Sequence, residues 1–283
     1  MLENRKKVAL SFDVELWNES EWLKPHIKEE ILLSDRSFEK SIDNILNLLK
    51  KNSHTATFFI TKEVIEKFPE YISKISKEGH EVGVHGPKHI RLEKYDPETF
   101  TKDCKNIIEK IEKITGQKPK GYRAPHFSLN QKTSWLIPTL VNLGFVYDSS
   151  VFPINLNEYG ISNCPAKPYK ISNENITKEN PDSNLTEVPI SIASFGKIKI
   201  PFAGGIYFRI LPLFIFKWLL KISSKNSTPV IYFHPHELEH STPQIKSGPF
   251  VKRLLKYWGT KSSFQKLEKI SNSYSFVSIF NIF

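Results

Sequence analysis

Hydrophobic residues in the first half of this chain follow two periodicities that alternate along it. Short runs rich in apolar and β-branched residues, the pattern of buried strands, are separated by stretches in which apolar residues recur every third or fourth position, the pattern of amphipathic helices. Strands are predicted at residues 8–15, 55–61, 80–85, 120–125 and 145–150. Helices are predicted at residues 37–52, 63–79, 96–116 and 130–144. This alternation predicts an α/β fold with a mostly parallel sheet and crossover helices.

Local signals mark the ends of two of these helices. Asp96 is predicted to be the N-cap of the third helix, with Pro97 at its first position and Gly116 at its end. Pro69 is expected to kink the second helix, because proline lacks an N–H and clashes with the preceding turn.

The pattern changes in the second half of the chain. Residues 154–185 are rich in Asn, Pro, Ser and Lys, and we interpret them as a long, substrate-facing excursion. Residues 185–192 and 197–204 then predict a pair of strands. We therefore expect residues 154–205 to be an insertion with a β pair, within a single domain that spans residues 1–283.

Residues 206–222 are the most hydrophobic stretch, but Arg209, Pro212 and Lys217 interrupt it. A membrane-spanning helix needs about 20 mainly apolar residues. We therefore expect one hydrophobic, amphipathic helix here, near the active-site mouth or a membrane surface, and not a span. Residues 228–239 predict a further strand that ends in a cluster of His and Glu, and two amphipathic helices and a last strand follow.

The chain has a net charge of +10, from 40 basic and 30 acidic residues among 283. Such an excess can favour nucleic acid, anionic lipid or an acidic substrate. The lysines are scattered along the predicted helices, however, and no nucleic-acid-binding motif is present, so we expect no nucleic-acid partner. A phosphate-bearing substrate and a peripheral membrane contact remain as explanations of the charge.

Cysteine usage and the first residues bear on the cellular compartment. Cys104 and Cys164 lie far apart, which gives neither a disulfide framework nor a thiolate metal site. The first residues include basic side chains but no apolar run long enough for a signal peptide. We expect a cytoplasmic protein, with membrane association left open, and the sequence predicts no particular oligomeric state.

Five polar residues fall at or just past the C-terminal ends of predicted strands. They are Asp13, His85, Arg123, Asp148 and His234. Catalytic groups of an α/β barrel gather at this edge of the sheet. Their shared placement therefore predicts one site, and it is a stronger signal than any single motif.

Two histidines and two acids have the spacing of a metal site. His85 and His89 lie four residues apart and can reach one ion from a helix face or from a loop after the strand. Asp13 and Glu15, two residues apart on a strand, point to the same side. Glu15 would complete a set of two histidines and one carboxylate that leaves positions open on zinc or a similar divalent ion, with Asp13 free as a base. Taken singly, the histidines also fit a surface turn and the acids a solvated strand end.

Five segments that contain these residues occur in a characteristic order. They are SFDVE at 11–15, HGPKH at 85–89, YRAPHFS at 122–128, GFVYDSSVF at 144–152 and IYFHPHE at 231–237. Together they resemble the polysaccharide deacetylase family, the NodB-type carbohydrate esterases. The opening DVELW and the stretch GGIYFR at 204–209 resemble a subgroup with an Asp-Val-Glu or Asp-Val-Asp opening.

The chain departs from the common family pattern at two positions. Val14 separates the candidate base from the candidate metal carboxylate, which is a glutamate. His126 follows Arg-Ala-Pro, where a residue that does not ionise is more usual.

The resemblance implies a distorted (β/α) barrel of the NodB type and one divalent metal ion on Glu15, His85 and His89. Zinc is the expected ion, with cobalt, nickel and manganese as alternatives. When bound, such an ion lowers the pKa of water and polarises an amide carbonyl. Asp13 is implied as the base that takes the proton of the attacking water.

The resemblance also implies roles for the remaining candidates. Arg123 would orient Asp13 and keep it ionised through a charge-assisted bond. His234 would be the acid that protonates the leaving amine, and Asp148 would hold that histidine in one tautomer and favour its protonated form. His126 would contact substrate, with a backbone N–H near it stabilising the oxyanion. A structural ion pair is the alternative for Arg123 and Asp148, and an ordinary loop residue is the alternative for His126.

Two histidines in IYFHPHE compete for the role of the acid. Pro235 is expected to end the strand, so that His234 holds its last regular position and His236 lies on the following loop. The match to the family also falls on His234, which we therefore expect to be the acid.

The function implied is hydrolysis of the N-acetyl group of an N-acetylated sugar, which releases acetate and a free amine. The expected substrate is a sugar nucleotide, a lipid-linked sugar or an oligosaccharide intermediate of surface-polysaccharide synthesis. Hydrolysis of another amide, such as a formamide or a cyclic ureide, is a second interpretation. A carbohydrate-binding protein without catalysis is a third, although binding alone requires neither Asp13 nor His234.

Overall fold

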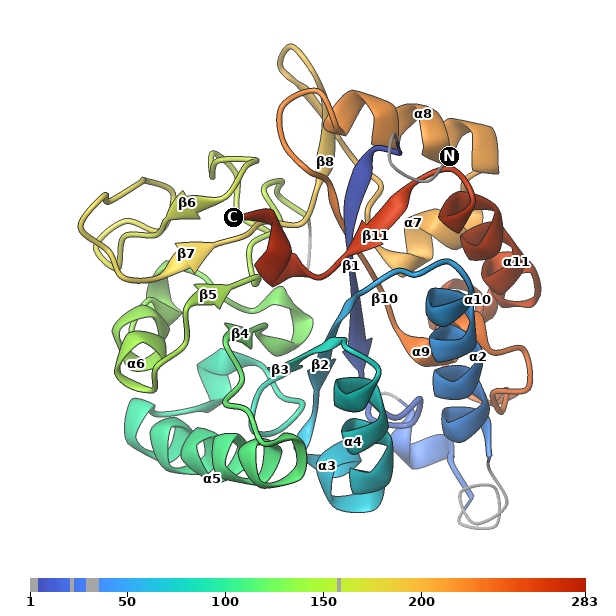
Figure 1. Cartoon of the computed structure of the whole chain (residues 1–283), viewed down its shortest axis with the longest axis horizontal. Coiled ribbons are helices and arrows are strands. Elements are labelled where there is room, and N and C mark those ends of the chain that lie inside the picture. Colours follow the sequence, from blue (N-terminus) through green and yellow to red (C-terminus); the bar gives the residue numbers. More distant parts are fainter. Residues whose placement is uncertain (1–4, 21–22, 29–35, 157–158) are drawn as a thin grey trace.

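A curled sheet of nine strands forms the centre of the structure (Figure 1). The computed structural model describes residues 5–20, 23–28, 36–156 and 159–283. The strand order is β10-β1-β2-β3-β4-β5-β7-β6, with β11 also paired to β1, and every pairing is parallel except β6–β7. This confirms the predicted α/β class, with the mostly parallel sheet curled as in a distorted (β/α) barrel.

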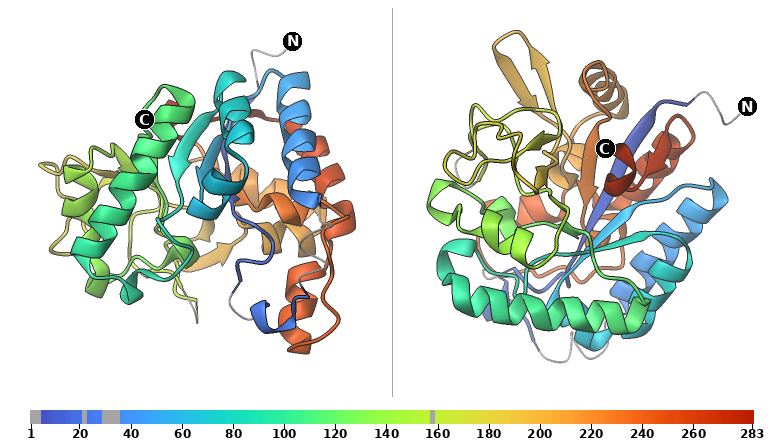
Figure 2. Two further views of the ribbon diagram at one scale, coloured as in Figure 1. Left: turned by 90° about the horizontal axis from the view of Figure 1, so that it is seen from below. Right: turned by 60° about the vertical axis from the view of Figure 1, so that its left-hand side comes forward.

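The strands and helices lie close to the predicted positions. The strands of the sheet are β1 Lys7–Val14, β2 Thr57–Ile60, β3 Glu81–Val84, β4 Gly121–Tyr122, β5 Tyr147–Asp148, β6 Tyr169–Lys170, β7 Thr186–Glu187, β10 Val230–Phe233 and β11 Ser275–Val277. Helices cover its outer face (Figure 2), namely α2 Ser37–Lys51, α3 Lys62–Lys67, α4 Pro69–Lys77, α5 Pro97–Thr115, α6 Leu136–Asn142 and α11 Thr260–Ser271.

Strand β1 is buried on both faces of the sheet. Every residue after Lys7 is buried, and the strand pairs with β10 on one side and with β2 on the other. The ring of Phe12 lies 5.0 Å from that of Phe58 and 6.4 Å from that of Phe233, centroid to centroid. Burial on both faces is typical of a strand in a parallel sheet. The two parallel pairings bring the ends of three strands to one edge.

The helix ends follow the local signals, with one exception. The side chain of Asp96 accepts a hydrogen bond from the N–H of Thr99 at 2.8 Å, and Gly116 ends α5 with a φ of 74°. Pro69 does not kink a single helix as predicted. It is the first residue of a separate helix, α4, where its missing N–H costs no helical hydrogen bond.

The predicted β pair is shifted along the chain. Thr186–Glu187 joins the main sheet as β7, between β5 and β6. The antiparallel pair consists instead of β8, Ile192–Phe195, and β9, Ile198–Pro201. Pro189 lies between β7 and β8, and a residue without an N–H cannot donate to a continuous ladder.

The hydrophobic stretch at 206–222 forms two helices and not the single helix predicted. They are α7, Gly205–Ile210, and α8, Leu213–Ser223. Leu211 between them has a ψ of 138°, the extended conformation that a following proline imposes. Among the described residues, every helix is too short or too polar to cross a membrane.

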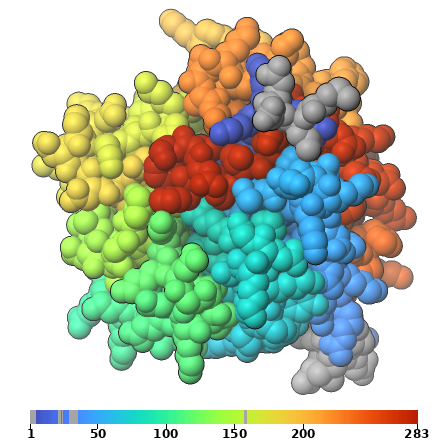
Figure 3. All heavy atoms as spheres, viewed as in Figure 1, coloured from blue at the N-terminus to red at the C-terminus, as the bar shows by residue number. Residues whose placement is uncertain are grey.

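The C-terminal segment covers the end of the sheet at which the strands begin. Strand β11 pairs with the first residues of β1, and the short helix η5, Ile279–Ile282, follows it. The N–H of Ile279 donates to Thr57 Oγ1 at 2.8 Å, and the N–H of Phe280 donates to Glu81 at 3.2 Å. Figure 3 shows this segment, in red, in the middle of one face. Both halves of the chain thus contribute to one sheet, although the single-domain assignment stays a prediction.

Candidate active site

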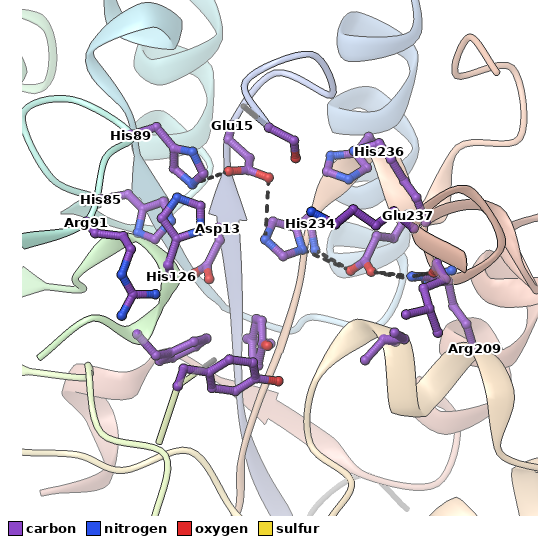
Figure 4. Close-up of a pocket in the computed structure, with 18 residues that line it drawn as sticks. Asp13, Glu15, His85, His89, Arg91, His126, Arg209, His234, His236 and Glu237 are labelled. Atoms are coloured by element: carbon purple, nitrogen blue, oxygen red, sulfur yellow. Dashed lines mark hydrogen bonds and ion pairs between the residues drawn. The ribbon is translucent and has the colours of Figure 1, made fainter. Parts of the chain in front are cut away.

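A cavity of about 410 Å³ lies at the edge where the parallel strands end (Figure 4). Six of the residues singled out in the sequence line it, namely Asp13, Glu15, His85, His89, His126 and His234. They come from the end of β1, the segments after β3 and β4, and the residue after β10. Arg123 lies buried directly beneath, bonded to Asp13, whereas Asp148 does not reach the cavity. The expectation that strand-end residues gather at one site therefore holds for all of them except Asp148.

Glu15, His85 and His89 form a compact group. One ligand atom from each lies within 4.8 Å of the others, and the Glu15 carboxylate forms an ion pair with His89 Nε2. The histidines approach each other through a loop and not on a helix, since β3 ends at Val84 and Gly86 has a φ of 71°. A Cβ on Gly86 would lie 2.7 Å from Pro125, so this loop passes tightly against the Arg-Ala-Pro segment.

The chemistry of this group fits a divalent ion. Burial alone would raise the pKa of Glu15, but the neighbouring His89 and His234 hold it well below its usual range. Burial lowers the pKa of His85 to about 4, so its imidazole is neutral near pH 7. His85 Nδ1 lies 3.1 Å from the carbonyl oxygen of Arg123, which fixes Nδ1 as the donor and leaves Nε2 with a lone pair. A charged carboxylate and an oriented neutral imidazole are the donors that zinc and similar ions take.

Asp13 is held by the fully buried guanidinium of Arg123. Arg123 Nη1 donates to Asp13 Oδ1 at 2.6 Å and to Ser11 Oγ at 2.9 Å. Its Nε and Nη2 donate to the carbonyl oxygen and the hydroxyl of Ser149, at 3.0 and 2.9 Å. With all three nitrogens engaged, the guanidinium fixes the direction in which the Asp13 carboxylate faces.

His234 follows the last residue of β10 and is the N-cap of the short helix α9, Pro235–Leu238. Its N–H donates to Glu237 Oε2 at 3.0 Å, and its Nδ1 lies 3.1 Å from the same oxygen. Its Nε2 lies 3.6 Å from Glu15 Oε1. Burial alone would lower the pKa of His234, but the carboxylates of Glu15 and Glu237 raise it to about 9. The imidazole therefore carries a proton at neutral pH.

The carboxylate that holds His234 is Glu237, and the prediction that Asp148 does so is wrong. Asp148 is fully buried and accepts a hydrogen bond from Ser150 Oγ, which in turn accepts from the N–H of Ala124 at 2.8 Å. Through Ser150, Asp148 therefore helps to fix the position of the Arg-Ala-Pro segment. Asp148 also lies in register with the buried Glu187. Burial raises the pKa of Asp148 to about 6 and raises that of Glu187 well above its usual range.

Glu237 and Arg209 form a buried pair that sequence reasoning missed. Arg209 Nε and Nη2 lie 3.2 and 3.0 Å from Glu237 Oε1. Arg209 also donates to the carbonyl oxygens of Leu255 and Trp258, at 2.9 and 2.6 Å, at the end of helix α10, Phe250–Tyr257. The sequence contains one signal for Glu237 but none for Arg209, because His234 and Glu237 have the spacing of an N-cap residue and its reciprocal partner.

His126 lies in an unusual backbone conformation. It has a φ of 57° and the next residue, Phe127, a φ of 47°, so two consecutive non-glycine residues are left-handed. Its ring lies 4.5 Å from that of His89, centroid to centroid. Such strain persists where the surroundings over-determine the backbone, and here Ser150 holds Ala124 in place. The role of His126 in binding substrate or an oxyanion stays a prediction.

His236 lies in α9, where a loop had been expected. Its ring stacks on that of His234 at a centroid distance of 5.2 Å, and it lines the same cavity. Pro235 ends the strand as predicted, but it also begins a helix, since proline suits the first helical position.

Two family models match the chain. The polysaccharide deacetylase model matches residues 3–144, and a domain of unknown function, DUF3473, matches residues 149–283. The first contains Asp13, Glu15, His85, His89 and Arg123, and the second contains His234 and Glu237. Each model thus supplies part of the cavity.

Curated relatives resemble part of the chain. The peptidoglycan deacetylase of Helicobacter pylori is 34% identical over 125 residues, 43% of this chain and 40% of that protein. A peptidoglycan-N-acetylglucosamine deacetylase of Bacillus cereus is 32% identical over 104 residues, 36% of this chain and 38% of that protein. The chain thus spans about 40% of the length of these relatives.

A solved structure resembles the whole fold. That of a putative polysaccharide deacetylase from Mycobacterium smegmatis aligns with 95% of this chain and 89% of its own, at 20% identity and a TM-score of 0.52. At this identity the likeness concerns the fold alone.

Proposed function

This chain belongs to the polysaccharide deacetylase family, and we propose that it hydrolyses the N-acetyl group of an N-acetylated sugar with a divalent metal ion. The observation that carries this proposal is the joint placement, around one cavity, of a candidate ion site, a carboxylate base and a protonated histidine. In hydrolysis of an amide, a base takes the proton of water and an acid protonates the leaving amine, and an ion can activate the water and the carbonyl.

Glu15, His85 and His89 would hold the ion, and zinc fits their donor types, with cobalt, nickel and manganese as alternatives. When bound, a divalent ion supplies a positive charge that acidifies water and polarises the amide carbonyl. Among these residues, burial alone would lower the pKa of His89, but the Glu15 carboxylate raises it above its usual value.

Asp13 is the proposed general base. The Arg123 guanidinium orients its carboxylate toward the cavity, where it accepts the proton of the attacking water. Because Arg123 is itself fixed by Ser11 and Ser149, the geometry of the base exists before substrate binds.

His234 is the proposed general acid. Its Nδ1 faces Glu237, which leaves Nε2 directed toward Glu15 and the cavity, where the amine would leave. A pKa of about 9 keeps the imidazole protonated until it donates. Glu237 thus takes the task that the sequence had suggested for Asp148.

The rim of the cavity supports a phosphate-bearing substrate. Arg91, Lys252 and Lys256 line it together with the apolar Leu255. The last three belong to α10, which has no buried residue and exposes Phe250 by 68% and Val251 by 63%. Basic and apolar side chains together favour a lipid-linked sugar over a free oligosaccharide, with the enzyme bound peripherally to a membrane.

A cytoplasmic location is part of the same proposal. Cys104 and Cys164 are both unpaired and buried, as suits a protein of a reducing compartment.

Acetate release tests the function. The protein, prepared with and without a chelator, would be given N-acetylated sugar nucleotides, polyprenyl-linked N-acetyl sugars and chito-oligosaccharides. We expect acetate from at least one class, lost with chelator and restored by zinc or cobalt. Absence of acetate with every class of substrate, or activity that the chelator leaves unchanged, would contradict the proposal.

A further inference from the structure

Glu15 faces a second pair of histidines in addition to His85 and His89. One carboxylate oxygen, Oε2, contacts His89, and the other, Oε1, faces His234 (Figure 4). We propose that Glu15, His234 and His236 form a second divalent-cation site, which shares Glu15 with the first. Resting on the proposed function, we further infer that an ion in this site removes the acid from catalysis.

The distances suit an ion between these three side chains. One ligand atom from each lies within 4.8 Å of the others, as in the first group. Glu15 Oε1 and His234 Nε2 are 3.6 Å apart. Two ligands bound tetrahedrally to zinc lie about 3.4 Å from each other, so this pair needs little movement.

The histidines of the second group are prepared as ligands. Glu237 Oε2 lies 3.1 Å from His234 Nδ1, and a carboxylate on one ring nitrogen orients the other toward a metal. In the described part of the chain, His236 Nδ1 is buried and has no hydrogen-bond partner. A buried, unpartnered imidazole nitrogen beside a carboxylate is expensive to maintain unless something binds it.

The two sites should differ in affinity. Lys256 lines the same cavity and interacts electrostatically with His236 and Glu237, so its positive charge opposes a further cation there. The first group lies on the other side of Glu15, toward β3. We therefore expect the second ion to bind more weakly, at metal concentrations above those that fill the first site.

The second ion competes directly with a proton. The Nε2 lone pair of His234 holds either the proton that the leaving amine receives or the ion, and binding the ion releases that proton to solvent. Activity should therefore rise with metal concentration, pass through a maximum and fall as the second site fills.

Metal stoichiometry tests the proposal without relying on activity. Chelator-treated protein would be dialysed against increasing ZnCl₂, and the bound zinc measured by elemental analysis. Wild type should reach two ions, whereas His236→Phe and His236→Gln should each reach one, as should His89→Ala. His240→Gln is the matched control, because His240 is a neighbouring histidine with a 77% exposed side chain that pairs with Glu239. This variant should still bind two ions.

Acetate release in the same titration reports the consequence. Wild type should lose about 10²-fold or more as the second ion binds, the usual contribution of a general acid. For each His236 variant, the rate of acetate release should stay close to that variant's own maximum over the zinc concentrations that inhibit wild type. Thermal unfolding would check that both variants are folded. The glutamine variant keeps a polar side chain, so a result shared by both variants does not come from a packing defect caused by phenylalanine.

Two results would overturn the second site. One is a wild type that saturates at a single zinc ion, and the other is a second ion that persists in both His236 variants. Either could occur with normal acetate release, which would leave the proposed function intact. Two bound ions without acetate release from any substrate would instead support the site and contradict the function.

Discussion

His234 lies between two carboxylates, and these determine the charge that it brings to the cavity. Burial alone would lower the pKa of His234, whereas Glu15 and Glu237 raise it to about 9. A histidine acid is active only while protonated, so kcat should fall as pH rises through this pKa.

Replacing Glu237 with glutamine should move this alkaline limb of the pH profile, the fall of kcat at high pH, to lower pH. The substitution removes one of the two charges that raise the pKa of His234, while the size of the side chain is kept. At neutral pH we expect kcat to fall about tenfold. The measurement is kcat against pH. Asp148→Asn is the control, because Asp148 does not touch His234, and an equal shift of the limb in that variant would contradict the assignment.

The two histidines of α9 should differ in their effect on catalysis. His234→Ala should lose ~10²–10⁴-fold in kcat while the first ion is retained, because its proton no longer reaches the amine. His236→Ala should lose much less, since Glu237 orients the imidazole of His234 through Nδ1. Steady-state kinetics and metal content at one equivalent of zinc separate the two, and a larger loss at His236 would show that the acid is misassigned.

Metal content should depend on His85 and His89. Removing either leaves one histidine and Glu15, an incomplete set, so we expect less bound ion and about 10-fold or more loss of activity. His54→Ala is a suitable control, because His54 lies outside the cavity and contacts the carbonyl oxygen of Ser271. Wild-type zinc content in both His85→Ala and His89→Ala would mean that the first site is wrong.

The sequence predicts residues at strand ends better than it predicts their partners. Asp13, Glu15, His85 and His89 lie where their motifs place them, because short segments after parallel strands have few ways to turn. Asp148 was assigned to the wrong partner, since a strand of two residues does not reveal which neighbour its side chain will face. Glu237 was missed because its segment was expected to be a loop.

At the scale of elements, Arg209 connects α7, α9 and α10. Arg209 pairs with Glu237 on α9 through Nε and Nη2, and Nη2 and Nη1 also donate to two carbonyl oxygens at the end of α10. The sequence shows Arg209 only as an interruption of a hydrophobic stretch, and periodicity predicts neither the break at Pro212 nor a buried partner 28 residues away.

Arg209→Ala should destabilise the fold by about 3 kcal/mol, because a buried charge on Glu237 would lose its partner. Urea unfolding measures this change in the free energy of unfolding. Arg36→Ala is the matched control, since Arg36 is 70% exposed and 3.7 Å from Glu39, and such surface pairs contribute less than about 1 kcal/mol. Similar losses in both variants would mean that the Arg209–Glu237 pair is not a structural connection.

At the scale of the whole molecule, apolar side chains gather at the border of the cavity. Helix α10 exposes Phe250 and Val251, and Trp258 beyond its end is 56% exposed. The same helix carries Lys252, Arg253 and Lys256, within a chain of net charge +10. Exposed aromatic residues beside basic ones are typical of helices that lie at a membrane interface.

We expect the protein to sediment with vesicles of phosphatidylcholine and phosphatidylglycerol. High salt or carbonate should release it from the vesicles, whereas a membrane-spanning protein would stay in the pellet. Phe250→Glu with Trp258→Glu should reduce binding about tenfold or more, since both side chains would leave the lipid. Gln117→Glu with Lys118→Gln makes the same change in charge at exposed positions elsewhere and should bind normally. Equal binding by all three proteins would contradict a docking role for α10.

The order in which the chain leaves the ribosome conflicts with the order of the sheet. Strand β1 is made first, yet β10 and β11 pair with it only after more than 200 further residues, and the bond from Ile279 to Thr57 spans 222. At a synthesis rate of ~5–20 residues per second, one edge of β1 stays unpaired for roughly ten to forty seconds before β10 is made. An apolar edge of this kind attracts other strands. During synthesis, aggregation should therefore begin at residues 8–14, and a chaperone that recognises short apolar segments should bind there until β10 and β11 arrive.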